Sequence, residues 1–459
     1  MPTMANALTS TILGVTRPAT SLPGARGAVV VRGGYVITMD PATGDLPGAD
    51  VLVSDGAIAA VGPSLAVPPG CREVDARGMV VAPGLVDTHW HMWNTLLRGT
   101  SESGPGYFRL TGRLGRAFGA DDVYHGTLLA CAEAVSSGIT TVHDWCHNVR
   151  GPGHAEAGLR ALAEAGLRGR FSYGYSAGHA NDQPMDLADL ARLHRDWDSY
   201  ADPALLSLGM AWRGTGGSDP AMRLRPEVYR REIGAARGLG LPVTVHACGP
   251  RSAAGQIKAL ADAGLLGPDL QVVHANCATD AEIAALAAAG TAVSVSPFSE
   301  LLIGYGLPRT TDLLAAGIPV GLSVDTTALT GNADMFAIMK VTQGIGNALA
   351  GDEFAFTARR TLGLATLDGA RSLGLGAVTG SLTPGKRADL IVVSAAGANL
   401  GVLTDPVQLL VTAAQPENVD TVLVDGRILK RGGALTTLDM ARIGRDAQAS
   451  VRGVLERAG

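Results

Sequence analysis

Residues 83–91 have the sequence Pro-Gly-Leu-Val-Asp-Thr-His-Trp-His, an apolar run that ends in two histidines separated by one residue. Alternate residues of a β-strand project to the same face of a sheet, so His89 and His91 would present both imidazoles on one side. The stretch therefore predicts a buried strand whose carboxyl end can bind an ion.

Later apolar runs end in a similar way. His246 and His274 each end a valine-rich run, and the carboxylate of Asp325 ends the run over residues 320–325. Helix-like stretches lie between these runs, and the alternation is typical of βα units around a parallel sheet. We expect eight strands, which end near these residues: His91, Asp144, Tyr175, Trp212, His246, His274, Ser296 and Asp325.

Eight βα units in roughly 250–300 residues predict an α/β fold of the (β/α)8, TIM-like barrel type, in which all strand ends meet at one mouth. The four histidines and Asp325 then supply three imidazoles, a carboxylate and a spare histidine, which suits a divalent ion such as Zn2+ or Fe2+. A single histidine after a strand is more often a core residue, so the prediction depends on the combination. An open doubly wound sheet is the structural alternative, although no GxGxxG motif follows the first strand.

Strand-like stretches also occur near both ends of the chain. Residues 28–61 and 388–429 are rich in valine, and each contains an Asp-Gly pair that is typical of a hairpin turn. The pattern predicts one small β-sandwich domain built from both ends, whereas two separate β appendages are the alternative. We expect these boundaries: a flexible tail over 1–27, the β-sandwich over 28–82 and 376–435, the catalytic barrel over 83–375, and a C-terminal helix over 436–459.

The composition excludes several classes of protein. Of 459 residues, 46% are hydrophobic and 17% are charged, so the chain can bury a large core and is not a disordered protein. The net charge of −5 without a basic stripe excludes nucleic acid as an expected partner. No apolar run reaches the roughly 18–20 residues of a membrane span. Five dispersed cysteines and an N-terminus without a signal-peptide pattern predict a cytoplasmic protein.

Seven stretches carry a further pattern: PGLVDTHWHMWNTLLRG (83–99), SSGITTVHD (136–144), VTVHA (243–247), VVHAN (272–276), SVSPFSELLIGYGLP (294–308), LSVD (322–325) and GARSLGLGAVTGSLTPGKRADLIVV (369–393). Together they resemble the amidohydrolase superfamily, in the branch that contains cytosine deaminase, guanine deaminase and s-triazine hydrolases. The resemblance covers nearly the whole chain after Ala28. It implies a distorted (β/α)8 barrel joined to a β-sandwich that both ends of the chain form.

The resemblance also implies a single metal ion and its ligands. The ion would be Zn2+, with Fe2+ or Mn2+ as alternatives, and its ligands would be these residues: His89, His91, His246 and Asp325. Some relatives hold a second metal on a carboxylated lysine of the fourth strand. None of the four lysines here lies near residues 206–212, so one metal is expected. A small-molecule substrate and a homodimer or larger homo-oligomer are implied as well.

The implied activity is hydrolysis of a C–N bond in a small cyclic or N-heterocyclic compound, by deamination or by opening of a cyclic amide or amidine. The metal would lower the pKa of a bound water from about 15.7 towards 7. Asp325 would accept the water proton. His274 would stand beside the water or the substrate and stabilise developing negative charge.

One position departs from the family pattern. Deaminases of this branch usually carry HxxE after the fifth strand, and that glutamate protonates a ring nitrogen, but residues 246–249 end in Gly249. Glu300, where relatives often have asparagine, and His147, after the second strand, are candidates to supply the proton. Cys248 is a weaker candidate, as a nucleophile.

The aromatic residues Trp93 and Phe298 lie in the predicted mouth loops, where they could stack on a flat ring. The missing glutamate leaves a second hypothesis open, a metal-dependent lyase, dehydratase or isomerase on the same barrel. A non-catalytic scaffold is a third hypothesis. The complete set of water-activating residues argues against the scaffold.

Overall fold

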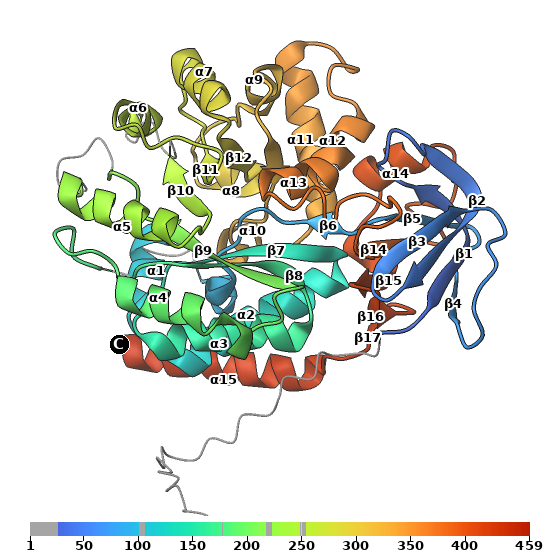
Figure 1. The fold of residues 1–459 in the computed structure, drawn as a ribbon, viewed down its shortest axis with the longest axis horizontal. Helices are drawn as coiled ribbons and strands as arrows, with labels where there is room; N and C mark the ends of the chain where they lie inside the picture. The colour runs from blue at the N-terminus through green and yellow to red at the C-terminus, as the bar shows by residue number, and fades with distance from the viewer. Residues whose placement is uncertain (1–25, 101–105, 177, 217–222, 248, 250–253) are drawn as a thin grey trace, which may run out of the picture.

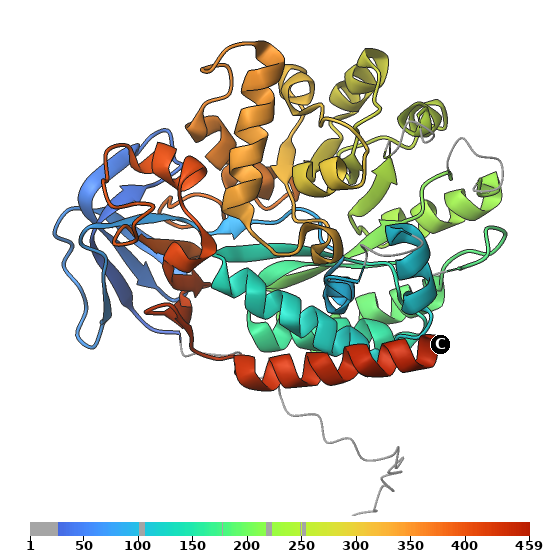
Figure 2. The ribbon, with the colours of Figure 1, turned by 180° about the vertical axis from the view of Figure 1, so that it is seen from behind.

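The structure is a computed structural model, and it describes residues 26–100, 106–176, 178–216, 223–247, 249 and 254–459 (Figure 1). The predicted tail over 1–27 lies almost wholly outside these residues, and so does Cys248. A barrel of strands and helices makes up the larger part of the molecule. A sheet formed by an N-terminal and a C-terminal segment lies at one side of it (Figures 1 and 2).

Eight parallel strands form the barrel sheet, in the order β13-β12-β11-β10-β9-β8-β7-β6. Almost all of their residues are buried, as expected for strands that are covered on both faces. The strands are β6 (Leu85–Val86), β7 (Ile139–Cys146), β8 (Arg168–Tyr173), β9 (Leu206–Trp212), β10 (Val243–Ala247), β11 (Leu270–His274), β12 (Ala292–Val295) and β13 (Val320–Leu322). The predicted α/β barrel is confirmed.

Hydrogen bonds of the segment after β6 close the barrel. The Asp325 backbone N–H, just beyond β13, donates to the His89 carbonyl at 2.9 Å, and the His91 N–H donates to the Asp325 carbonyl at 2.7 Å. On the other side, the Trp90 N–H donates to the His143 carbonyl of β7 at 2.9 Å. The two histidines of the HxH pair are therefore held between two strands by their own backbone.

The helices pack around the barrel, apart from α14, which lies beside the terminal sheet (Figure 1). They are η1 (Met92–Leu97), α1 (Tyr107–Gly115), α2 (Ala120–Ser136), α3 (Pro152–Ala165), α4 (Leu187–Arg195), α5 (Pro226–Gly238), α6 (Gln256–Asp262), α7 (Asp280–Ala289), α8 (Pro297–Leu302), α9 (Thr310–Ala315), α10 (Thr327–Thr330), α11 (Met335–Ala350), α12 (Ala358–Leu364), α13 (Leu367–Ser372), α14 (Pro406–Thr412) and α15 (Met440–Ala458). Local sequence explains their ends, as α7 shows. Thr279 and Glu282 form a reciprocal capping box at its start, and Gly290, with a φ of 68°, ends it.

Both ends of the chain contribute to one mixed sheet of nine strands. The strands are β1 (Val29–Ile37), β2 (Asp45–Ser54), β3 (Ala57–Gly62), β4 (Arg72–Asp75), β5 (Met79–Pro83), β14 (Leu390–Ser394), β15 (Val419–Val424), β16 (Arg427–Arg431) and β17 (Ala434–Leu435). β14 pairs antiparallel with β5 over five residues, which joins the two ends. The sheet has an apolar core of its own, so the alternative of two separate β appendages is excluded.

A buried ion-pair network fastens this sheet to the amino end of the barrel. Arg168, at the start of β8, donates from Nε to Asp389 at 2.5 Å, and all the groups involved are almost inaccessible to solvent. Asp425, in the turn between β15 and β16, also accepts from Arg427 at 2.8 Å. Because removing one partner would leave a buried charge unpaired, this network fixes the base of the barrel. This ion-pair network lies at the amino ends of the strands, whereas the mouth lies at their carboxyl ends.

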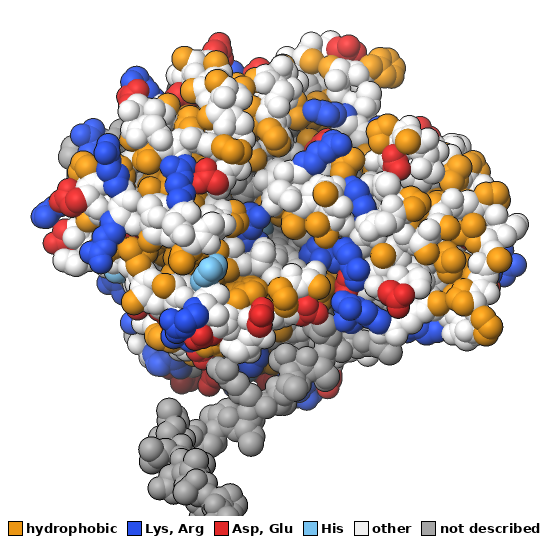
Figure 3. Space-filling model, in the orientation of Figure 1, with side chains coloured by type: hydrophobic (Ala, Val, Ile, Leu, Met, Phe, Trp, Pro, Cys, Tyr) orange, Lys and Arg blue, Asp and Glu red, His pale blue; other side chains and the backbone are white. Residues whose placement is uncertain are grey.

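The surface is mixed in character. On the face drawn in Figure 3, basic and acidic side chains are interspersed with apolar ones. None of the helices in the described ranges is long and apolar enough to cross a membrane. Helix α15 lies along α2 on the outside of the barrel (Figure 2).

The carboxyl group of Asp144 is buried in the packing between β7 and α3. The Asp144 side chain points towards Gly158 of α3 and is inaccessible to solvent. Burial raises the pKa of Asp144 to about 7 from an ordinary value of 3.8, although the nearby Met92 N–H opposes the change. The native protein therefore keeps a proton on Asp144 that the unfolded chain gives up between these two pH values.

We predict that Asp144→Asn removes a pH-dependent loss of stability. A native state that binds the extra proton loses stability as pH rises from about 4 to 7, by up to about 4 kcal/mol for this shift. Urea unfolding at pH 4.5 and 7.5 measures the difference between wild type and the variant, which should move in favour of the variant at the higher pH. A difference that does not change with pH would contradict the prediction.

Candidate metal centre

Four side chains from distant parts of the chain converge at the barrel mouth: His89, His91, His246 and Asp325. One ligand atom from each lies within 4.8 Å of the others, and the group is almost wholly buried. The Nε2 atoms of His89 and His246 lie 3.2 Å apart. Asp325 Oδ1 lies 3.3 Å from His89 Nε2 and 3.5 Å from His91 Nε2. The strand-end rule thus placed these four residues together.

The backbone at two of the strand ends is strained. Asp325 has a φ of 61° and His274 a φ of 77°, in the left-handed region that favours glycine. Residues in such conformations cost roughly 1–3 kcal/mol each and persist where the surrounding structure holds them. The backbone hydrogen bonds to the HxH segment hold Asp325 in this conformation. Its carboxylate then points towards the histidines.

The three imidazoles of the cluster are neutral. Burial lowers the pKa of His89, His91 and His246 well below the usual range, and the neighbouring imidazoles lower it further. The Nδ1 of His91 lies 3.2 Å from the Trp145 carbonyl, which fixes the proton there and leaves the lone pair on Nε2. Burying three imidazole lone pairs and a carboxylate is unfavourable unless a bound cation offsets the cost. The set of donors therefore fits a divalent metal ion.

His274 lies beside the cluster, and Glu300 holds it there. Its ring centre is 5.4 Å from that of His246, and its Nδ1 is 3.1 Å from Oε1 of the fully buried Glu300. Burial opposes a positive charge on His274, but the hydrogen bond to Glu300 and the carboxylates of Asp325 and Glu300 together outweigh burial and raise its pKa. The same carboxylate oxygen accepts from the Ser296 N–H at 2.7 Å. Glu300 therefore contacts His274 directly.

His147 lies on the other side of the cluster. Its ring centre is 4.4 Å from that of His91, and its Nδ1 lies 3.4 Å from the indole N–H of Trp93. Burial lowers the pKa of His147 to about 4, so the ring is neutral at pH 7. Trp93 is only 1% exposed and packs behind His147, against Phe118. Phe298 is the second residue of α8 and packs, half-buried, against the barrel core.

The sequence did not predict two further residues of the mouth, Ser299 and Tyr107. Ser299 donates a hydrogen bond to Asp325 Oδ2, the oxygen that faces away from the histidines. Tyr107, at the start of α1, accepts a hydrogen bond from the Asn94 amide at 3.1 Å, and burial raises its pKa. Both belong to helices after strand ends rather than to the strands, so a rule that inspects strand ends does not find them.

The lysines lie away from the cluster. Lys258 pairs with Asp262 on α6, and Lys386 and Lys430 donate to backbone carbonyls at the sheet end of the molecule. Lys340 lies on α11, and strand β9 contains no lysine. The described residues thus offer one group of ligands and no bridging lysine.

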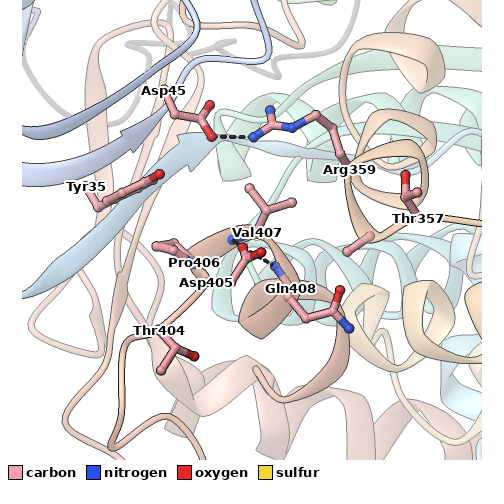
Figure 4. A pocket seen from close by; sticks show the side chains of 10 residues that line it. Tyr35, Asp45, Thr357, Arg359, Thr404, Asp405, Pro406, Val407 and Gln408 are labelled. Carbon is pink, nitrogen blue, oxygen red and sulfur yellow. Dashed lines mark hydrogen bonds and ion pairs between the residues drawn. The ribbon is translucent and has the colours of Figure 1, made fainter. Parts of the chain in front are cut away.

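A separate groove of about 470 Å³ lies between the terminal sheet and helices α12 and α14 (Figure 4). It shares no residue with the metal cluster. Its charged groups serve the fold, because Arg359 pairs with Asp45 and Asp405 caps α14. We therefore place the functional site at the mouth and not in this groove.

Comparison with known proteins identifies the family of the chain. Residues 80–429 match the Amidohydrolase family. A 5'-deoxyadenosine deaminase of Methanosarcina acetivorans is 29% identical over 436 residues, which cover 94% of this chain and 99% of that protein. A 5-methylthioadenosine/S-adenosylhomocysteine deaminase of Moorella thermoacetica is 32% identical over 436 residues, with 88% and 95% covered.

Solved structures of other proteins have a similar fold. An adenosine deaminase from Xanthomonas campestris with bound zinc superposes with a TM-score of 0.82 at 26% identity, covering 95% of this chain and all of that one. An atrazine chlorohydrolase from Arthrobacter aurescens complexed with zinc has a TM-score of 0.80 at 23% identity, covers 92% and 100%, and shares the fold. The chain belongs to the amidohydrolase family. It is a metal-dependent hydrolase of carbon–nitrogen bonds other than peptide bonds.

We predict that His89→Ala loses its metal while the fold survives. His89 touches two of the other three ligands, so the remaining donors no longer surround an ion. Metal analysis after purification should find less than roughly a tenth of an equivalent, against about one in wild type, for a site with one ligand removed. Exposed His194→Ala is the matched control. A full equivalent of metal with retained activity in His89→Ala would refute the assignment.

We predict that Glu300→Gln lowers kcat more than it raises KM. The amide keeps the size of the side chain but not the charge that raises the pKa of His274. We expect kcat to fall by about 10- to 100-fold with KM within about threefold, as for loss of one positioned acid–base partner. Glu282→Gln, at the buried cap of α7, controls for removing any buried carboxylate. An unchanged kcat would show that Glu300 has no catalytic importance.

Proposed function

We propose that this enzyme deaminates the 6-amino group of a purine nucleoside with a modified 5′ position, using one zinc ion. The observation that carries the proposal is the cluster of three histidines and Asp325, with His274 beside it, in a chain that aligns over most of its length with deaminases of such nucleosides. Zinc is preferred because three imidazole nitrogens and a carboxylate suit it, with Fe2+ or Mn2+ as alternatives.

The ion would be held by His89, His91, His246 and Asp325. When bound, it would lower the pKa of a water molecule from about 15.7 towards 7, which makes hydroxide available at neutral pH. The three imidazoles stay neutral in the buried site, so none of them competes for the proton of that water. Trp145 fixes the tautomer of His91 through its carbonyl.

Asp325 would move the proton. Its Oδ2 is held by the Ser299 hydroxyl and its Oδ1 faces the histidines, so the carboxylate is fixed beside the place where the water would be bound. The water oxygen bonds to the ring carbon, its proton passes to Asp325, and the C–N bond then breaks as the amine leaves with that proton as ammonia. His274, oriented by Glu300, would donate a hydrogen bond to the oxygen that attacks.

The flanking residues have supporting roles in this proposal. His147, which is neutral and held by Trp93, would form one wall of the substrate site, and Phe298 would contribute to the other side. Residues 83–375 would act as the catalytic barrel, and residues 28–82 with 376–435 as the β domain. We further propose a cytoplasmic enzyme that works as a homodimer or larger homo-oligomer, since apolar side chains such as Phe354, which is 75% exposed, offer surface for a second copy.

The lyase or isomerase hypothesis has less support. It depends on the glycine at position 249, whereas the relatives that align over most of the chain bear the names of deaminases. The scaffold hypothesis does not explain why three imidazoles and a carboxylate converge in a buried cluster, since burying such polar groups costs stability.

We predict that the zinc-loaded enzyme converts a 5′-modified adenosine to its 6-oxo product. The assay incubates a panel of adenosine, 5'-deoxyadenosine, methylthioadenosine, cytosine, guanine and triazines in H2 18O. Mass spectrometry should show replacement of NH2 by 18OH in one nucleoside of the panel. Release of product without 18O would contradict hydrolysis, and turnover of only a triazine or free base would contradict the nucleoside assignment.

A further inference from the structure

The place of the missing glutamate is filled by a tyrosine. A Cβ built on Gly249 would lie 2.8 Å from Cε2 and Cζ of Tyr305 and 3.0 Å from its hydroxyl oxygen. These distances are shorter than side chains tolerate, so the ring of Tyr305 occupies the space into which a longer side chain at position 249 would extend. The position of the Tyr305 ring therefore requires a residue without a side chain at position 249.

Tyr305 is fixed beside the reacting groups. It follows α8, and its backbone N–H donates to the Glu300 carbonyl at 2.8 Å. Its ring centre lies 5.4 Å from that of His274, nearly perpendicular to it. Burial raises the pKa of Tyr305, and the carboxylates of Asp325 and Glu300 add to the effect. The hydroxyl therefore keeps its proton and is a hydrogen-bond donor over the working range of pH.

The other candidates at the mouth are held by neighbouring residues. Oε1 of the Glu300 carboxylate is shared by His274 and the Ser296 N–H, which fixes the carboxylate on His274, and its Oε2 has no hydrogen-bond partner among the described residues. His147 accepts from Trp93. Within the described part of the chain, no hydrogen bond engages the Tyr305 hydroxyl, which leaves it available to a ligand.

We propose that Tyr305 is a catalytic residue whose hydroxyl donates a hydrogen bond to the ring nitrogen next to the carbon that water attacks. This proposal rests on the proposed deamination. Attack on that carbon moves an electron pair onto the adjacent ring nitrogen, and a donor aimed at the nitrogen stabilises the charge as it develops. In relatives with HxxE a glutamate meets this nitrogen, whereas here a phenol hydroxyl reaches the same place from another loop.

The test begins with Tyr305→Phe, loaded with zinc and assayed on the nucleoside that wild type deaminates. We expect kcat to fall by about 10- to 100-fold and KM to stay within about threefold, as for a donor used mainly in the transition state. Tyr124→Phe, which removes a hydroxyl from a tyrosine on α2, is the matched control. Metal content and melting temperature should equal those of wild type.

A binding measurement separates this role from a structural one. The 1-deaza analogue of the nucleoside has C–H in place of the ring nitrogen, so Tyr305 has nothing to donate to. Its inhibition constant should be the same, within about twofold, for wild type and Tyr305→Phe, as for a ligand that lacks the contact. A large change in this constant would mean that the hydroxyl only shapes the pocket, which would overturn the proposal.

A rescue variant tests the exchange of the two residues. Gly249→Glu alone should be inactive because of the clash, whereas Gly249→Glu combined with Tyr305→Ala should recover at least about tenfold in kcat over Tyr305→Ala, by restoring a donor. The role of Tyr305 would be refuted if Tyr305→Phe kept its activity and the double variant recovered none. The deamination itself would still stand in that case. If wild type deaminates no nucleoside, the proposed function itself falls.

Discussion

The backbone hydrogen bonds between Asp325 and the HxH segment are the constraint on which the site depends. They close the barrel between its first and last strands. The same hydrogen bonds bring three of the four ligands together, His89, His91 and Asp325. The positive φ of Asp325 is the local cost of this closure. Because closure and ligand placement cannot be separated, a barrel that closes correctly presents the cluster, and a slip of one residue would turn both imidazoles away.

Neighbouring contacts then orient several side chains of the mouth. The Trp145 carbonyl orients His91, the Ser299 hydroxyl orients Asp325, and Glu300 orients His274 beside the ligands. At the other end of the barrel, the ion pair between Arg168 and Asp389 secures the terminal sheet. The fold therefore separates its functions, with stability anchored at the amino ends of the strands and reactivity at the carboxyl ends.

Much of this arrangement could be predicted from the sequence, because strand ends are visible as apolar runs that stop at a polar residue. That rule predicted the barrel and brought the residues of the metal cluster together, whereas valine-rich runs with Asp-Gly turns predicted the terminal sheet. It could not show that Glu300 binds His274, since this contact joins a helix to a different strand. It also gave no role to Tyr107 and could not connect Gly249 with Tyr305, because a space filled from another loop leaves no mark in the local sequence.

The central claim is that one metal ion sits among four side chains at the barrel mouth. Anomalous diffraction from crystals of the zinc-loaded enzyme, measured on both sides of the zinc edge, tests it most directly. We expect a single strong peak at about 2.0–2.2 Å from the Nε2 atoms of His89, His91 and His246 and from the Asp325 carboxylate, the distances usual for zinc. A strong peak elsewhere, or a second one of equal height nearby, would contradict this description of the enzyme.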